Sequence, residues 1–70
     1  MPTNYKEEWS YTNSDGKFCK EYDLFFECSA KNAVKRVYDD YSQYSDLRIQ
    51  YVWKECADCW EEIDSWLWEE

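Results

Sequence analysis

The most reactive side chains in this sequence are its four cysteines, two of which form the C-x-x-C motif Cys56-Ala57-Asp58-Cys59. We expect this motif to follow a strand and begin a helix, a position where a thiol pKa falls and disulfide exchange becomes possible. The neighbouring acids Glu55 and Glu61 act against such exchange, because negative charge raises a thiol pKa. Redox chemistry therefore stays an alternative, and small buried thiols, with Cys59 on an apolar helix face, are the main expectation.

A four-cysteine zinc site is a second alternative, and its ligands would have to surround one ion. Cys19 and Cys28 are predicted to lie in one strand, where a rise of about 3.3 Å per residue separates them by roughly 30 Å. They cannot share an ion unless that strand is broken. We therefore expect no metal and no cofactor.

Other catalytic groups are scarce in this chain. It has no histidine, which is the commonest general base, and its single glycine excludes a glycine-rich phosphate loop. The adjacent carboxylates Glu7-Glu8, Asp39-Asp40 and Glu61-Glu62 are expected on solvated faces. The sequence therefore predicts a binding protein and no enzyme.

The net charge of −8 is unevenly distributed along the chain. Residues 1–28 carry −3, residues 29–54 carry +2, and residues 55–70 carry −7. Such a surface repels nucleic-acid phosphate and anionic lipid, so we expect neither direct nucleic-acid binding nor membrane binding. The natural partner is a basic protein surface, although acidity that only keeps an aromatic-rich protein soluble is a simpler explanation.

The length of 70 residues predicts a single small domain over residues 1–70. No stretch approaches the roughly 18 apolar residues of a membrane span, and the start lacks the basic and apolar regions of a secretory signal. We therefore expect a cytoplasmic protein, in which cysteines stay reduced by default.

Alternation of side chains predicts a β-hairpin in the first part of the chain. Residues 5–12 place Tyr5, Glu7, Trp9 and Tyr11 on one side, and Asp15-Gly16 provides the turn. The second strand, residues 17–28, has two different rows. Its apolar row holds Phe18, Tyr22, Leu24, Phe26 and Cys28, and its other row holds Cys19, Glu21, Asp23, Phe25 and Glu27.

The second part of the chain predicts a helix, a strand and a final helix. Ser29 is a natural N-cap for a helix reaching Gln43, a third strand follows at residues 46–54, and the final helix begins near Ala57. The expected fold is α+β, a small antiparallel three-stranded sheet with two helices in the order ββαβα. The first strand should lie between the second and third.

The predicted final helix would separate acids from apolar side chains. At about 100° per residue, Cys59, Trp60, Ile63, Trp66 and Leu67 share one arc, and they must bury against the sheet edge or a second copy of the chain. A homodimer is therefore possible. Trp68 falls in the opposite arc among carboxylates, which would form a band of charge with Asp58, Glu61, Glu62, Asp64 and Glu69.

Size, net charge, absent catalytic groups and the acidic run Glu55 to Glu70 together resemble small acidic bacteriophage proteins that mimic DNA. The resemblance implies an inhibitor in the host bacterial cytoplasm that occludes the basic DNA-binding surface of a host protein, with the nucleoid protein HU preferred. The predicted partner-binding residues are the band and Trp68 as an aromatic anchor, extended by three strand acids: Asp58, Glu61, Glu62, Asp64, Trp68, Glu69, Glu21, Asp23 and Glu27.

The alternative function is a phage protein-interaction module that does not mimic DNA. It would bind a host protein such as RNA polymerase, or pair as an antitoxin-like dimer, through exposed aromatic side chains. Salt separates the two hypotheses, because binding through a carboxylate band weakens with added salt and aromatic contacts persist.

Overall fold

The computed structural model describes residues 2–69, and its first element is the predicted hairpin. Strands β1 (Thr3–Thr12) and β2 (Phe18–Glu27) pair antiparallel along their whole length. Gly16 has a φ of +79°, the left-handed conformation that a side chain disfavours. The side-chain oxygen of Asn13 accepts hydrogen bonds from the backbone N–H groups of Asp15 and Lys17, which fixes the turn.

Helix α1 (Ala30–Asp40) begins where the sequence predicts. The hydroxyl of Ser29 accepts a hydrogen bond from the backbone N–H of Asn32 at 3.1 Å, which caps the first turn. The helix ends at Asp40, before the predicted Gln43, and the chain then turns back toward the sheet.

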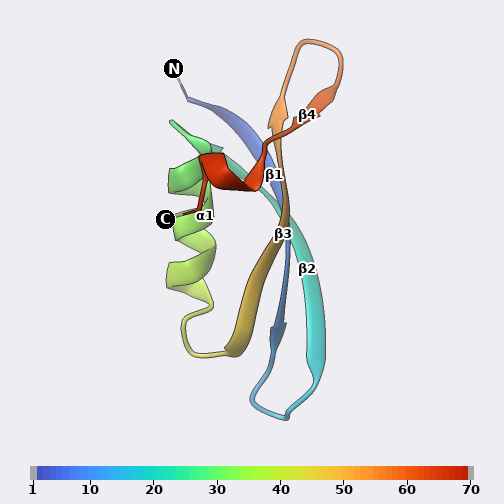
Figure 1. The fold of residues 1–70 in the computed structure, drawn as a ribbon, viewed down its shortest axis with the longest axis vertical. Coiled ribbons are helices and arrows are strands. Elements are labelled where there is room, and N and C mark those ends of the chain that lie inside the picture. The colour runs from blue at the N-terminus through green and yellow to red at the C-terminus, as the bar shows by residue number, and fades with distance from the viewer. Residues whose placement is uncertain (1, 70) are drawn as a thin grey trace.

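Strand β3 (Ser45–Glu55) pairs antiparallel with β1, so β1 lies between β2 and β3 as predicted. The complete sheet has the order β2-β1-β3-β4, where β4 is the short strand Trp60–Glu62. The molecule is elongated, with extents of 40 × 21 × 20 Å, and the β3–β4 hairpin forms one end (Figure 1).

The predicted final helix is wrong. Residues 60–62 form β4 against β3, and only a single 3-10 turn, η1 (Ser65–Leu67), follows. The fold is α+β with a four-stranded antiparallel sheet and one α-helix in the order ββαββ, which corrects the expected three-stranded sheet with two helices. A helix would have stacked Asp58 over Glu62, a like-charge pair that repels. The hairpin removes that stacking.

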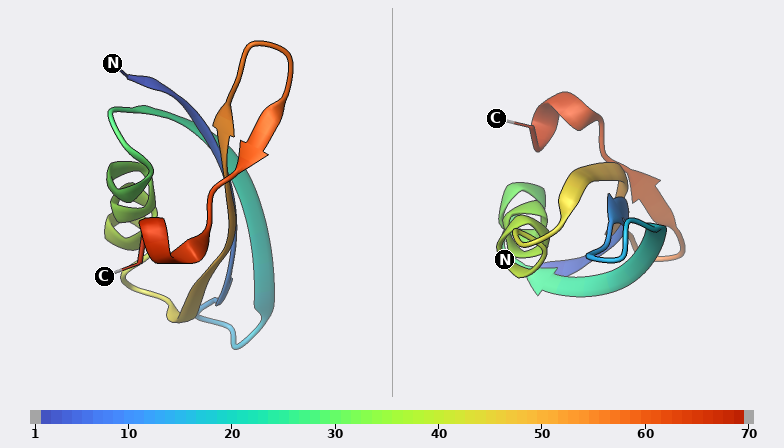
Figure 2. Two further views of the ribbon diagram at one scale, coloured as in Figure 1. Left: turned by 45° about the horizontal axis from the view of Figure 1, so that its top comes forward. Right: turned by 90° about the horizontal axis from the view of Figure 1, so that it is seen from below.

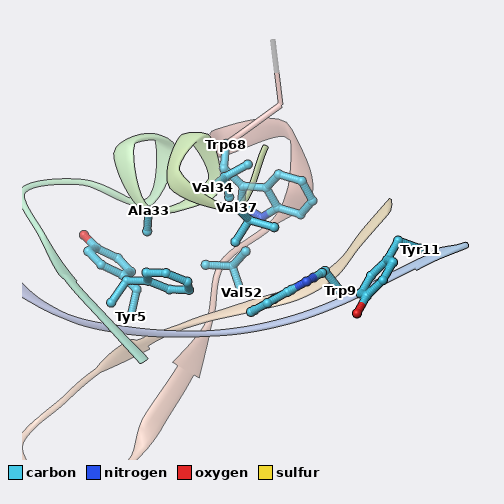
Figure 3. Close-up of a cluster of buried hydrophobic side chains, with 9 residues drawn as sticks. Tyr5, Trp9, Tyr11, Ala33, Val34, Val37, Val52 and Trp68 are labelled. Atoms are coloured by element: carbon cyan, nitrogen blue, oxygen red, sulfur yellow. The ribbon is translucent and has the colours of Figure 1, made fainter. Parts of the chain in front are cut away.

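The core lies between α1 and one face of the sheet. Residues 63–69, which we call the C-terminal segment, close it from the side (Figure 2). Trp68 is only 6% exposed and packs with Val34 and Val37 of the helix (Figure 3). The other buried apolar side chains are Tyr5, Trp9, Tyr11, Phe25, Ala33 and Val52.

One carboxyl group lies within this core. Glu7 is completely buried, and within residues 2–69 neither of its carboxyl oxygens has a hydrogen-bond partner. Burial raises the pKa of Glu7 from 4.5 to about 8, against the lowering effect of Arg36 and with a smaller raising effect of Asp23. The expectation that Glu7 and Glu8 are both solvated is therefore wrong for Glu7.

Over the described residues, no helix has both the length and the apolar character needed to cross a membrane.

Candidate interaction surface

The face of the sheet opposite α1 is uncovered, and we call it the open face. On β2 it presents Phe18, Tyr22, Leu24 and Phe26, which are 72%, 67%, 54% and 64% exposed. The other row of β2, which is more acidic, points to the helix side. An amphipathic strand normally buries its more apolar row, so the orientation of β2 is inverted.

Strand pairing explains this inversion. The aromatic row of β1 points to the helix, and the antiparallel register places Phe25 opposite Tyr5 and Glu21 opposite Trp9. Because alternate residues of a strand share a face, the remaining apolar residues of β2 must point outward. The sequence shows both rows, but it does not show which row the helix covers.

The central strand supplies a polar row across the open face. Glu8 forms an ion pair with Lys20 at 3.7 Å, and the side-chain amide of Gln50 donates a hydrogen bond to the hydroxyl of Ser10 at 3.0 Å. Lys6 completes the row. The Glu8–Lys20 and Gln50–Ser10 pairs satisfy their polar groups within the protein, and the row separates two apolar areas.

The second apolar area lies on the β3–β4 hairpin. On this hairpin Trp53 lies opposite Glu62, and Glu55 lies opposite Trp60. The four side chains form one patch in which each ring has a carboxylate beside it on its own strand and another across on the neighbouring strand. We call these four residues the tryptophan–carboxylate cluster. The ring of Tyr51 stacks on Trp53 with centroids 5.4 Å apart.

A cation already lies against this cluster. The ammonium nitrogen of Lys6 is 4.9 Å from the ring centroid of Trp53 and 4.9 Å from that of Trp60, within the range of cation–π attraction. The carboxylate of Glu55 accepts a hydrogen bond from the side chain of Asn4 at 3.2 Å.

The open face carries little of the net charge. Its ionic side chains are three cations and four carboxylates, namely Lys6, Lys20, Arg48, Glu8, Asp46, Glu55 and Glu62. It therefore contributes a formal net charge of −1, so most of the formal net charge of −8 does not come from this face.

Comparison with known proteins adds no relative to these observations. No family model, curated protein or solved structure matches the chain.

The predicted strand acids lie on the helix side of β2. Glu21 accepts a hydrogen bond from the Tyr11 hydroxyl at 2.9 Å, and Glu27 pairs with Arg36 at 3.1 Å. Asp23 is exposed between them. Two of these three carboxylates are therefore already engaged within the protein.

The predicted acids of the C-terminal region are dispersed. Asp58 is exposed in the β3–β4 turn, while Glu61, opposite Lys54, and Glu62 point to opposite faces of β4. Asp64 precedes η1 and Glu69 follows it. These five carboxylates do not form a band along a helix, because residues 58–69 contain no α-helix.

Trp68 points into the core. Its indole N–H donates a hydrogen bond to the backbone oxygen of Ile63 at 3.4 Å. It also borders a hollow of about 520 Å³ between α1 and the C-terminal segment, lined by Lys31, Val34, Lys35, Tyr38, Asp39, Trp68 and Glu69. With 6% of its surface exposed, Trp68 offers a partner little contact area in this position.

The cysteines of the motif meet at the β3–β4 turn, where the backbone N–H of Cys56 donates a hydrogen bond to the oxygen of Cys59 at 2.8 Å. Burial raises the pKa of the Cys56 thiol, and neighbouring Cys59 and Glu61 raise it further, so its reactive thiolate is disfavoured. Cys28 and Cys59 are exposed, which corrects the expectation of buried thiols for these two. No group of three potential metal ligands occurs among residues 2–69.

Proposed function

We propose that this protein is an interaction module that binds a basic partner protein through the open face of its sheet. The inverted orientation of β2 carries this proposal, because it places four large apolar side chains in water while three carboxylates occupy the helix side. Exposed apolar patches of this kind typify protein interaction sites.

The open face has the composition of a binding surface. Aromatic side chains dominate it, and they supply large contact areas at low conformational cost. A fully buried aromatic side chain covers about 150–250 Å², so the six exposed large side chains Phe18, Tyr22, Leu24, Phe26, Tyr51 and Trp60 offer roughly 700 Å². A standard interface buries about 800 Å² per partner.

Charge indicates what kind of partner fits. Most of the negative charge lies outside the open face, where it attracts a basic protein at long range without having to be desolvated in the contact. The proposed interface therefore combines aromatic contacts at its centre with electrostatic steering from its surroundings. Added salt should slow association more than it speeds dissociation.

Mimicry of DNA stays a prediction. It relied on a band of carboxylates along a helix, and the structure distributes those side chains over the β3–β4 hairpin and the segment that follows. Competition with duplex DNA separates the two functions, because a mimic shares its binding surface with DNA and the proposed module does not need to.

Affinity capture from a bacterial lysate with matched variants tests the proposal. Tyr22→Ser/Phe26→Ser alters the open face, and Trp66→Ser removes an aromatic that is 72% exposed in η1, outside the sheet. We expect the captured partner to bind the open-face variant at least tenfold more weakly, to bind Trp66→Ser normally and to stay bound in duplex DNA. The opposite result would replace the proposal with mimicry. In that case the partner would bind Tyr22→Ser/Phe26→Ser normally, would fail to bind Glu61→Gln/Asp64→Asn, and would be displaced by duplex DNA.

A further inference from the structure

We infer that the tryptophan–carboxylate cluster is a binding site for an arginine side chain of the partner, and that Lys6 occupies it in the free protein. This inference rests on the proposed function, since it names the chemistry by which the open face recognises a basic protein. The position of the Lys6 ammonium group against both tryptophan rings shows that the cluster accepts a cation.

The arrangement of the four cluster residues explains this preference. Register pairs place each tryptophan beside a carboxylate both along its strand and across to the neighbouring strand. A cation above the patch therefore meets the negative faces of Trp53 and Trp60 together with the charges of Glu55 and Glu62. The four side chains come from adjacent strands of one hairpin, so the sheet holds them in register without a ligand.

One carboxylate of the cluster is uncommitted. Glu55 accepts a hydrogen bond from Asn4, whereas Glu62 is exposed and takes part in no side-chain hydrogen bond or ion pair within residues 2–69. Lys6 lies over the rings, and no carboxylate of the described chain is within ion-pair distance of its ammonium group. The Lys6 ammonium group therefore contacts both rings without forming an ion pair among the described residues.

Arginine fits this site better than lysine. Its planar guanidinium group stacks on a tryptophan ring, is less strongly hydrated than an ammonium group, and can present two parallel N–H donors to one carboxylate. A guanidinium group stacked on Trp60 would have Glu62 beside it as the acceptor. Lys6 loses little when it is displaced, because its ammonium group regains water and its flexible stem can follow the strand surface.

The test uses capped hexapeptides that differ only in two central residues, either arginine, lysine or norleucine, titrated at low salt while tryptophan fluorescence is recorded. Lys6→Thr keeps a strand-forming residue but is too short to reach the rings, so it empties the site. We expect Lys6→Thr to bind the arginine peptide three- to tenfold more tightly than the unaltered protein. Trp60→Leu and Glu62→Gln should each weaken binding more than fivefold, and Trp66→Leu should change nothing.

Thermal unfolding followed by circular dichroism establishes that each variant is folded before titration. The inference would be overturned if the unaltered protein, Lys6→Thr and Trp60→Leu all bound the arginine peptide with equal affinity. Equal binding of the arginine and norleucine peptides would also overturn it.

The two proposals fail in different ways. In one case the cluster variants weaken peptide binding, but Trp60→Leu and Tyr22→Ser/Phe26→Ser both capture the protein partner normally. The arginine site then stands and the proposed function fails. If capture needs Tyr22 and Phe26 while the peptides show no arginine preference, the inference alone fails.

Discussion

Glu7 is the single residue whose chemistry departs furthest from its sequence context. It stands in the row of β1 that contains Tyr5, Trp9 and Tyr11, and the structure buries it with no hydrogen-bond partner for its carboxyl oxygens within residues 2–69. Its pKa of about 8 keeps it protonated in the folded state at neutral pH. In the unfolded chain the same group ionises near its ordinary pKa of 4.5.

This difference makes stability depend on pH. Below pH 4.5 both states hold the proton and Glu7 costs nothing through ionisation. Between pH 4.5 and about 8 only the unfolded state releases it, so the free energy of unfolding falls as pH rises. The full loss is about 5 kcal/mol at most, and it is complete above the folded-state pKa.

Replacing this carboxyl group with an amide should remove the effect. We expect Glu7→Gln to raise the free energy of unfolding by about 2–3 kcal/mol at pH 7 and to flatten its pH dependence between pH 5 and 8. Urea unfolding at a series of pH values measures both quantities. Glu8→Gln on the open face is the matched control. If the free energy of unfolding changed equally with pH in the unaltered protein, Glu7→Gln and Glu8→Gln, the raised pKa of Glu7 would be contradicted.

The alternation of β1 predicts the row to which Glu7 belongs, but it does not predict burial of a carboxyl group, because burial normally requires a partner. The same limit applies to β2. Its two rows are visible in the sequence, yet the more apolar one is exposed since the helix packs on the row set by β1. Faces of single strands are therefore predictable, and the choice of the covered face depends on tertiary contacts.

At the scale of elements, the hairpin, the helix start and the third strand follow from local signals. Asp15-Gly16 specifies the turn, and Ser29 caps the helix. The final helix was predicted wrongly because the apolar residues of the C-terminal region fit a helical spacing over a short window. Strand pairing with β3 overrides that spacing, and the backbone N–H of Ile63 donates to the oxygen of Val52 at 2.8 Å.

Trp68 is the buried side chain of the C-terminal segment, and Ile63 packs against the same core. We expect Trp68→Ala to lower the free energy of unfolding by about 3 kcal/mol, because it empties a buried ring site against Val34 and Val37. Trp66→Ala, two residues earlier and 72% exposed, should change it by less than about 0.5 kcal/mol. Similar losses in denaturant titrations of the two variants would show that the segment is not docked as described.

At the scale of the whole molecule, charge repulsion and the open face act against each other. A strongly negative net charge keeps copies apart at neutral pH, whereas near the isoelectric point of about 4.4 this repulsion vanishes. We expect light scattering to rise as pH approaches 4.4 while circular dichroism still reports the folded state. Tyr22→Ser/Phe26→Ser should suppress the rise, and scattering equal to that of the unaltered protein would show that another surface drives association.

The strand order also sets how the chain can reach its native state. The β1–β2 hairpin closes over a short turn, but β1 obtains its second partner only when β3 arrives, and the register pairs Tyr5 with Lys54 across most of the sequence. Forming that contact requires closing a long loop, which slows folding relative to helical domains of similar length. Until then the edge of β1 that will pair with β3 has free backbone N–H and C=O groups, and the aromatic side chains of the β1–β2 hairpin are exposed. The interval before β3 docks is therefore when one nascent chain is most exposed to pairing with another.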